Sequence, residues 1–319
     1  MDLFLATAKG LVIAQRDDDV WRVKSRSLDG KELTCVASSG STIYVGALDG
    51  VYRSTDRGQT WIELKEGLSI KHARWIAYHA DRVFVGTEPA NIFVLHEGES
   101  MWHECTEVAK LRDVHQWFLP YSPEAGCIRG FAFHGSRAYA AAEVGGSLRS
   151  NNHGETWALC GGSTGNPSLD DPPAPYIYPD VHSVEVHPSS ADLLYAPTGG
   201  GFYRSMDGGQ TWKSFYDCYV RAAWIDPIDP NHIILGPADG VSSNGRIEES
   251  RDGGKSWKKA SNGLDVPWRR YMVERFVQVG DDLLAVLSNG QLLSAALTSL
   301  KWQRILVDVP NVNGLAALS

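Results

Sequence analysis

The sequence predicts an all-β protein that folds as a seven-bladed β-propeller. The prediction rests on a repeated octet, on regularly spaced tryptophans and on pairs of short β-type segments between them. The octet follows the pattern S-x-[DN]-x-G-x-[TS]-W. It occurs as STDRGQTW at 54–61, SNNHGETW at 150–157, SMDGGQTW at 205–212 and SRDGGKSW at 250–257.

Tryptophans divide the chain into units of similar length. Four of them end the octets, and three end weaker copies, RDDDVW, HEGESMW and LTSLKW. Together they stand at positions 21, 61, 102, 157, 212, 257 and 302, so that successive marks are 40 to 55 residues apart. Units of this length match a propeller blade of four strands rather than a two-helix solenoid repeat.

Each unit is expected to contain an inner strand followed by a hairpin. The inner strands are predicted at 74–79, 129–134, 182–188, 221–227 and 274–280. The hairpins, in which two β-branched or aromatic runs flank a glycine-containing turn, are predicted at 42–54, 82–95, 137–150, 193–205 and 283–294. Helical periodicity is nearly absent, as expected for an all-β chain.

The two ends of the chain complete one blade together. The segment NGLAALS at 313–319 reads as an innermost strand with no hairpin after it, and 3–15 reads as a hairpin with no innermost strand before it. Pairing them closes the ring and covers sheet edges that would otherwise be exposed. We therefore expect residues 1–319 to form one propeller domain.

Composition limits the classes of function. The chain has 319 residues, 43% of them hydrophobic, and a formal net charge of −8, which disfavours a nucleic-acid or membrane surface. Its five cysteines form no CxxC pair, and the N-terminal segment lacks a basic and apolar targeting pattern. We expect a cytoplasmic, bacterial protein with reduced thiols.

The octets resemble the BNR or Asp-box repeat of sialidases, sortilin-type receptors and photosystem II assembly factors. The resemblance implies that each octet forms the turn between the outer two strands of a blade, with its tryptophan wedged between blades. It also implies a structural role for Asp56, Asp207 and Asp252, whose carboxylates accept backbone N–H bonds. Asn152 replaces the aspartate in the second octet, and its amide oxygen can accept the same bonds.

Two long segments are predicted to border the ligand-binding face of the propeller. Residues 103–128 and 158–181 lie where outer strands lead to the next inner strand, and both are rich in proline and aromatic residues. The aromatic residues are Trp117, Phe118, Tyr121, Tyr176 and Tyr178. We expect an ordered lid or rim in which His115, Trp117 and Tyr178, together with Tyr271, contact a ligand.

Polar residues are predicted to gather at the mouth of the central channel. The first positions of the seven inner strands are Thr34, Arg74, Arg129, His182, Arg221, Glu274 and Asn313. Three arginines that converge on one axis suggest an anionic ligand, such as a carboxylate, phosphate or sulfate group. The alternative is a water-filled channel with internal ion pairs, for example between Arg221 and Glu274.

Acidic residues near this mouth are candidate catalytic or metal-binding groups. Glu88 and Glu143 stand at equivalent hairpin turns of adjacent blades. With His182, and with Asp180 or His115 as further candidates, they could form a general acid–base group or bind a divalent metal. The alternative is that both carboxylates form salt bridges with nearby arginines.

The predicted function is that of a hydrolase acting on a small anionic or sugar-like substrate, namely an ester, a phosphate or sulfate ester, a lactone or a glycoside. Glu88, Glu143, His182 and Glu274 are the candidate catalytic residues. Sialidase activity itself is not expected, because sialidases have six blades and because the F/Y-R-I-P motif of that family is absent. The alternative is a non-catalytic propeller that binds a ligand or protein, like the sortilin-type and assembly-factor relatives.

Overall fold

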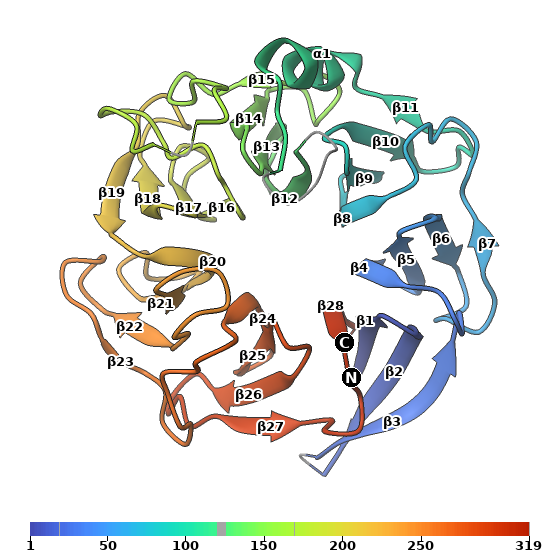
Figure 1. Ribbon diagram of the computed structural model, residues 1–319. Coiled ribbons are helices and arrows are strands. Elements are labelled where there is room, and N and C mark those ends of the chain that lie inside the picture. The colour runs from blue at the N-terminus through green and yellow to red at the C-terminus, as the bar shows by residue number, and fades with distance from the viewer. Residues whose placement is uncertain (19, 120–125, 169, 319) are drawn as a thin grey trace.

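The computed structural model describes residues 1–18, 20–119, 126–168 and 170–318, and it confirms the all-β, seven-bladed propeller. Seven four-stranded antiparallel sheets surround one central channel (Figure 1). The first two blades contain β28 (Val312–Leu318), β1 (Asp2–Thr7), β2 (Gly10–Asp17) and β3 (Val20–Ser27), then β4 (Leu33–Ser39), β5 (Thr42–Ala47), β6 (Gly50–Ser54) and β7 (Ile62–Glu63).

The remaining blades follow in chain order, each with its innermost strand first. The third contains β8 (Ala73–His79), β9 (Arg82–Thr87), β10 (Ile92–His96) and β11 (His103–Glu104), and the fourth β12 (Ile128–His134), β13 (Arg137–Ala142), β14 (Gly146–Ser150) and β15 (Ala158–Leu159). The fifth contains β16 (Glu185–Val186), β17 (Leu194–Thr198), β18 (Gly201–Ser205) and β19 (Lys213–Tyr216). The sixth contains β20 (Tyr219–Ile225), β21 (Ile233–Ala238), β22 (Glu248–Ser250) and β23 (Lys258–Lys259), and the seventh β24 (Val273–Val279), β25 (Asp282–Leu287), β26 (Leu292–Ala296) and β27 (Gln303–Ile305).

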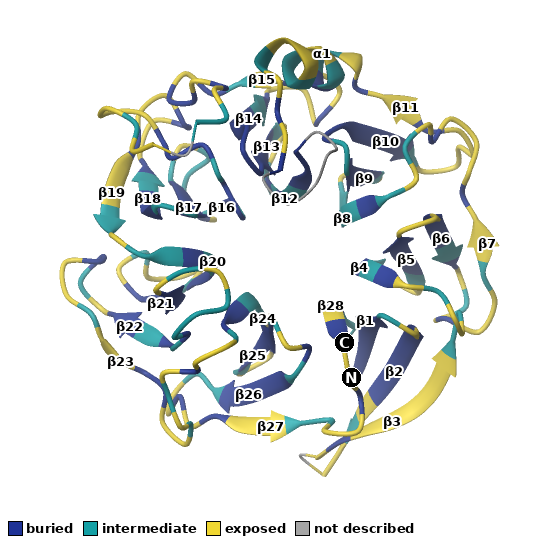
Figure 2. Ribbon diagram, in the orientation of Figure 1, coloured by how far each residue is buried: buried dark blue, intermediate teal, exposed yellow. Residues whose placement is uncertain are grey.

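Strands from the two ends of the chain close the ring, as predicted. β28 pairs with β1 in antiparallel register, with Leu315 opposite Leu5, and β1 continues into the hairpin with β2. β1 is buried along its whole length, whereas β28 is buried only in part (Figure 2). The edges of the first and last sheet segments are therefore hydrogen-bonded to each other, which removes an open edge that could pair with another molecule.

The hydrophobic core consists of seven clusters, each between two neighbouring blades. Each cluster contains one of the seven tryptophans that divide the sequence, either within it or packed against it. Trp157, for example, packs with Phe84 of the preceding blade and Leu148 of its own. Burying one large aromatic side chain at every interface stabilises the ring at equal intervals.

The four octets form the turns between the third and fourth strands of their blades. In the third octet, the Ser205 hydroxyl accepts a hydrogen bond from the Gly209 amide at 2.8 Å, and an Asp207 carboxylate oxygen accepts one from the Thr211 amide at 2.9 Å. Asn152 accepts the equivalent bond from Thr156 at 3.1 Å. The octet is therefore a structural turn, and its carboxylate is occupied by the backbone.

One helix, α1 (Thr106–His115), interrupts the described part of the segment 103–128, where no helix was expected. It lies on the outer rim of the ring (Figure 1) and contributes Val108 to the core between the third and fourth blades. The single buried residue in ten explains why hydrophobic periodicity gave little signal. Tyr121 of the same segment lies outside the described residues. No helix among the described residues is long and apolar enough to cross a membrane.

Candidate functional site

A repeated irregularity of the innermost strands positions the side chains at the channel mouth. In six blades the register between the first and second strand shifts by one residue near the same end. The residues at these shifts are Thr34, Arg74, Arg129, Arg221, Glu274 and Asn313. A bulge takes one residue out of the hydrogen-bonded ladder and redirects its side chain. All six residues line cavities of the channel, as their alignment predicted.

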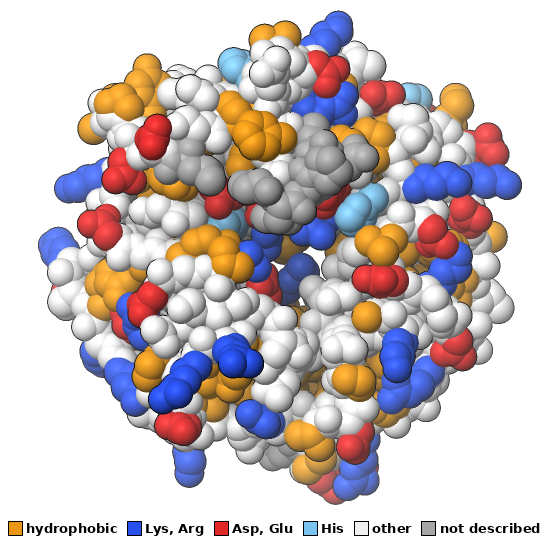
Figure 3. Space-filling model, viewed as in Figure 1, with side chains coloured by type: hydrophobic (Ala, Val, Ile, Leu, Met, Phe, Trp, Pro, Cys, Tyr) orange, Lys and Arg blue, Asp and Glu red, His pale blue; other side chains and the backbone are white. Residues whose placement is uncertain are grey.

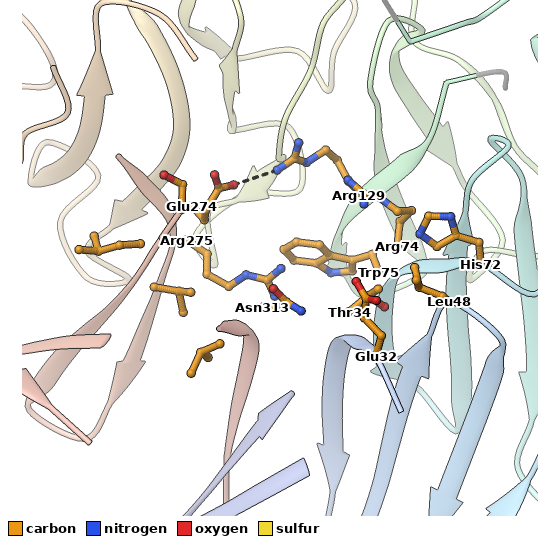
Figure 4. A pocket seen from close by; sticks show the side chains of 14 residues that line it. Glu32, Thr34, Leu48, His72, Arg74, Trp75, Arg129, Glu274, Arg275 and Asn313 are labelled. Carbon is orange, nitrogen blue, oxygen red and sulfur yellow. Dashed lines mark hydrogen bonds and ion pairs between the residues drawn. The ribbon is translucent and has the colours of Figure 1, made fainter. Parts of the chain in front are cut away.

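The channel contains two adjoining cavities. The outer one has a volume of about 320 Å³ and is lined by Arg74, Arg129, Glu274 and Arg275, among others (Figure 4). The second, of about 130 Å³, shares the last three of these residues and adds Arg221 and Glu185. Figure 3 shows basic and acidic side chains gathered around the opening. The outer volume lies at the lower end of the range for small-molecule sites.

The three arginines predicted at the channel mouth, Arg74, Arg129 and Arg221, each form an ion pair with a carboxylate. The Glu274 carboxylate lies 2.6 Å from Arg221 and 3.4 Å from Arg129. Arg74 lies 3.4 Å from Glu88, whose carboxylate is also 3.9 Å from His72. These contacts match the alternative of internal ion pairs at the mouth, so the three guanidinium groups are held in place before any ligand arrives.

Glu143 and Glu274 are carboxylates that stay ionised at neutral pH. Burial opposes the ionisation of Glu274, but the Arg221 and Arg129 guanidinium groups outweigh it and lower the pKa of Glu274. For Glu143, which is 2% exposed, burial is again outweighed by Arg129, with His182 and a hydrogen bond donated by the Cys127 thiol at 3.0 Å, and the pKa is lowered. Neither group is suited to donate a proton near pH 7.

Arg275 is a channel residue that the strand alignment did not select. It follows the bulge residue Glu274, and its guanidinium carbon lies 4.2 Å from the centre of the Trp75 ring (Figure 4). Among the described residues its buried Nε has no hydrogen-bond partner and its side chain has no ion-pair partner. Burial lowers the pKa of Arg275 to about 10, which still leaves it positively charged at neutral pH.

The sequence does contain a signal for this residue. One position after the aligned residue at the channel mouth, five of the seven blades carry a small side chain: Cys35, Gly130, Ser183, Ala222 and Gly314. The other two positions hold Trp75 and Arg275, which stack on each other. A Cβ atom on Gly314 would lie 3.2 Å from a terminal nitrogen of Arg275, so that small residues provide the space for the arginine.

His182, Asp180 and Glu143 form a compact group beside the second cavity. One ligand atom from each lies within 4.8 Å of the others. The His182 ring is fully buried, with Nδ1 2.7 Å from the Val220 carbonyl oxygen and Nε2 3.1 Å from Asp180 Oδ2. Glu88, which was expected to complete a metal site with Glu143 and His182, is not part of this group, and Asp180 takes its place.

The predicted aromatic contacts lie apart from the two cavities. Trp117 is 1% exposed and donates a hydrogen bond to the Gly165 carbonyl at 2.8 Å, with His115 stacked against its ring. Tyr178 packs in the core between the fourth and fifth blades. Tyr271 stacks on Trp268 instead of facing the arginines. These side chains contribute to packing, whereas their predicted role was ligand contact.

Glu185 and Tyr219 are two further channel residues whose side chains could take part in binding or proton transfer. The Tyr219 hydroxyl accepts hydrogen bonds from Arg221 at 2.8 and 3.0 Å. Glu185 lines the second cavity. Glu185 stays solvent-exposed within the channel, but the protein atoms around it partly withdraw its carboxyl from bulk water and raise its pKa to about 7, which suits a group that exchanges protons near neutral pH.

The fold defines the class of this protein as a seven-bladed β-propeller. No protein-family model and no curated protein matches the sequence. Among solved structures, it is similar to an ancestral GH74 enzyme, with a TM-score of 0.65 and 16% identity over 94% of this chain and 40% of the enzyme. It is also similar to YCF48 bound to D1 peptide, with a TM-score of 0.62 and 14% identity over 92% of this chain and 87% of YCF48.

A further similar structure is YCF48 from Cyanidioschyzon merolae, with a TM-score of 0.62 and 14% identity over 92% of this chain and 89% of that one. At these identities the likenesses show the fold alone. One neighbour is an enzyme and another is described with a bound peptide, so the neighbours do not distinguish catalysis from binding. The site itself has to carry the functional argument.

Proposed function

We propose that this protein binds a small molecule with an anionic group at the mouth of its central channel, with Arg275 as the main anchor. The observation that carries the proposal is the half-buried Arg275 side chain, whose Nε is buried and which has no carboxylate partner among the described residues. Carboxylate, phosphate and sulfate groups can accept two parallel hydrogen bonds from such a group. The outer cavity of about 320 Å³ has room for a small ligand beside it.

The energetics of Arg275 support this proposal. A partly buried charge without an ion-pair partner is costly, and a well-placed anion would offset that cost. The stack on Trp75 stabilises the cation by about 1–2 kcal/mol and fixes the plane of its nitrogen atoms. The other three arginines already have carboxylate partners, so they shape a positive rim while Arg275 supplies the free hydrogen-bond donors.

A thermal-shift experiment with inorganic sulfate tests the anion site. At constant ionic strength, sulfate at ten times its dissociation constant is expected to raise the Tm of the wild-type protein by about 2–4 °C. Arg275→Met should abolish this shift. Because the variant also removes a buried unpaired charge, it should stabilise the sulfate-free protein by about 1 kcal/mol.

The matched control is Arg246→Met, which removes an arginine that pairs with Glu248 and Asp239 outside the two cavities. This variant should keep the sulfate-dependent shift. The proposal fails if sulfate, phosphate and acetate all leave the wild-type Tm unchanged, or if Arg275→Met responds to them as the wild type does.

A second candidate function, hydrolysis of a bound ester, phosphate or sulfate ester, lactone or glycoside, is favoured by Glu185. Its carboxylate could accept a proton from a water molecule whose oxygen attacks the scissile bond, and the carboxyl could then return that proton to the leaving oxygen. Glu185 lines the same cavity as Arg129 and Arg221. A panel of chromogenic substrates tests turnover. If anions bind and no substrate is cleaved, the non-catalytic binding role is retained instead.

The titration of Glu185 has a measurable consequence for stability. Because its folded-state pKa of about 7 lies above the unfolded value of about 4.3, its stabilising contribution is complete below pH 4 and is lost as the pH rises to 7. Glu185→Gln should lack this loss, so that its stability relative to wild type increases between pH 4.5 and 7 and is constant above pH 8. Urea unfolding at each pH measures the difference. A difference between Glu185→Gln and the wild type that stays flat over this pH range would refute the assignment.

A further inference from the structure

We propose that Glu143, Asp180 and His182 bind a divalent transition-metal ion beside the second cavity of the channel. Their ligand atoms lie within 4.8 Å of one another, and the three residues come from two segments that the chain separates by more than thirty residues. This metal site is independent of the proposed anion site. Arg275 is not one of its ligands, and the experiment below measures bound metal rather than bound anion.

The hydrogen bonds of His182 show that its Nε2 atom is the one available for a ligand. Nδ1 faces the Val220 carbonyl oxygen at 2.7 Å, and a carbonyl can only accept, so Nδ1 carries the proton. In the neutral ring, Nε2 then presents a lone pair to the carboxylate of Asp180 at 3.1 Å. Two lone pairs at this distance require either a second proton or a cation between them. A backbone carbonyl on the far nitrogen is the usual support of a metal-bound histidine.

The carboxylate of Asp180 provides a second, independent observation. Its Oδ1 atom is buried and has no hydrogen-bond partner among the described residues. An orphaned carboxylate oxygen is costly unless a cation or proton satisfies it. Gly199 leaves the space for this carboxylate, because a Cβ atom there would lie 2.4 Å from Asp180 Oδ2.

A second buried histidine shows what an ordinary ion pair looks like in this protein. His232 contacts the Asp226 carboxylate through Nδ1 at 3.1 Å and the Glu249 carboxylate through Nε2 at 3.0 Å. Each of its nitrogen atoms therefore faces a carboxylate, and Arg251 and Lys258 also pair with Glu249. His182 differs because one nitrogen is committed to a carbonyl and the third group, Glu143, adds another carboxylate.

Ligand type and spacing favour Zn²⁺, Mn²⁺ or Co²⁺ over Ca²⁺ or Mg²⁺. One imidazole with two carboxylates suits transition metals, whereas the hard ions prefer oxygen ligands throughout. Two ligands of such an ion stand about 3.0–3.4 Å apart, which agrees with the 3.1 Å between His182 and Asp180. Arg129 contacts both oxygens of Glu143 at 3.2 Å, and a carboxylate has further lone pairs for a metal. Three protein ligands leave a coordination position for water or substrate.

The test measures metal binding directly on the protein of residues 1–319. Chelator-treated protein is titrated with zinc chloride by calorimetry, and cobalt chloride is followed by its visible absorption. We expect about one ion per chain. Asp180→Asn and His182→Gln should each weaken binding at least tenfold and change the cobalt spectrum.

Asp226→Asn is the matched control, because it removes a carboxylate from the other histidine pair and should leave metal binding unchanged. Circular dichroism identifies any variant that fails to fold. If a variant does not fold, the cobalt spectrum of the wild-type protein still tests the proposal. Absence of zinc and cobalt binding up to 1 mM would overturn the proposal and leave the contact between His182 and Asp180 as an ordinary hydrogen bond. Binding that persists unchanged in both ligand variants would overturn it as well.

Discussion

Replacing Glu274 with leucine is expected to lower the free energy of unfolding by about 3–5 kcal/mol. The Glu274 carboxylate joins two largely buried guanidinium groups, at 2.6 Å from Arg221 and 3.4 Å from Arg129. Without it, Arg221 keeps the Tyr219 hydroxyl as its partner and its charge is no longer compensated. Removing one member of a buried ion pair is costly because the other charge stays buried. Urea unfolding, followed by tryptophan fluorescence, measures the loss.

A matched variant separates this effect from a general sensitivity of the channel mouth. Glu32 lines the same outer cavity but is exposed and has no ion pair among the described residues, so Glu32→Leu should change stability by less than about 0.5 kcal/mol. Sulfate should restore part of the stability of Glu274→Leu, because it can take the place of the missing carboxylate. If both variants lost the same free energy of unfolding, the ion pairs of Glu274 would contribute no more to stability than an exposed carboxylate does.

Trp117→Ala is expected to destabilise the protein by about 3–5 kcal/mol and to leave the sulfate-dependent thermal shift intact. The indole is 1% exposed, packs between the third and fourth blades and donates its N–H to Gly165. Truncation would remove most of this contact area and leave a cavity beside the ring carbons that approach Gly145. Urea unfolding and the sulfate thermal shift together measure both parts of the prediction.

The neighbouring Phe118 provides the control, since its side chain is 51% exposed. Phe118→Ala should cost less than about 1 kcal/mol. If Trp117→Ala instead kept its stability and lost the response to sulfate, the residue would belong to the ligand site, as the composition of the segment 103–128 first suggested. The pair of variants therefore decides whether this segment supports the ring or binds ligand.

Much of the fold could be predicted because its signals are local and repeated. Each octet forms its turn through bonds among its own residues, as Ser205, Asp207 and Thr211 illustrate. The same chemistry recurs in blade after blade, so the repeat length alone predicts the number of blades. The alignment also placed six bulge residues at the channel mouth, because every inner strand carries the same irregularity.

The aromatic residues of the long segments were harder to place, because composition does not say which side of a segment is buried. Trp117 and Tyr178 both lie in packed cores. Their environment depends on residues far along the chain, such as Gly145 and Gly200, which leave room for the two rings. A single sequence contains no pattern that pairs a ring with such a glycine.

The sequence by itself determined the seven-bladed ring, its closure by the two chain ends and the polar character of the channel mouth, because turn chemistry and strand alternation act between near neighbours and repeat. The tertiary structure alone decided which charges compensate each other. It paired Glu274 with two arginines, left Arg275 on Trp75 without a carboxylate partner in the described part of the chain, and brought Asp180 in place of Glu88 beside Glu143 and His182. These contacts join different blades across the channel, where side-chain length and the space left by small residues determine the partner.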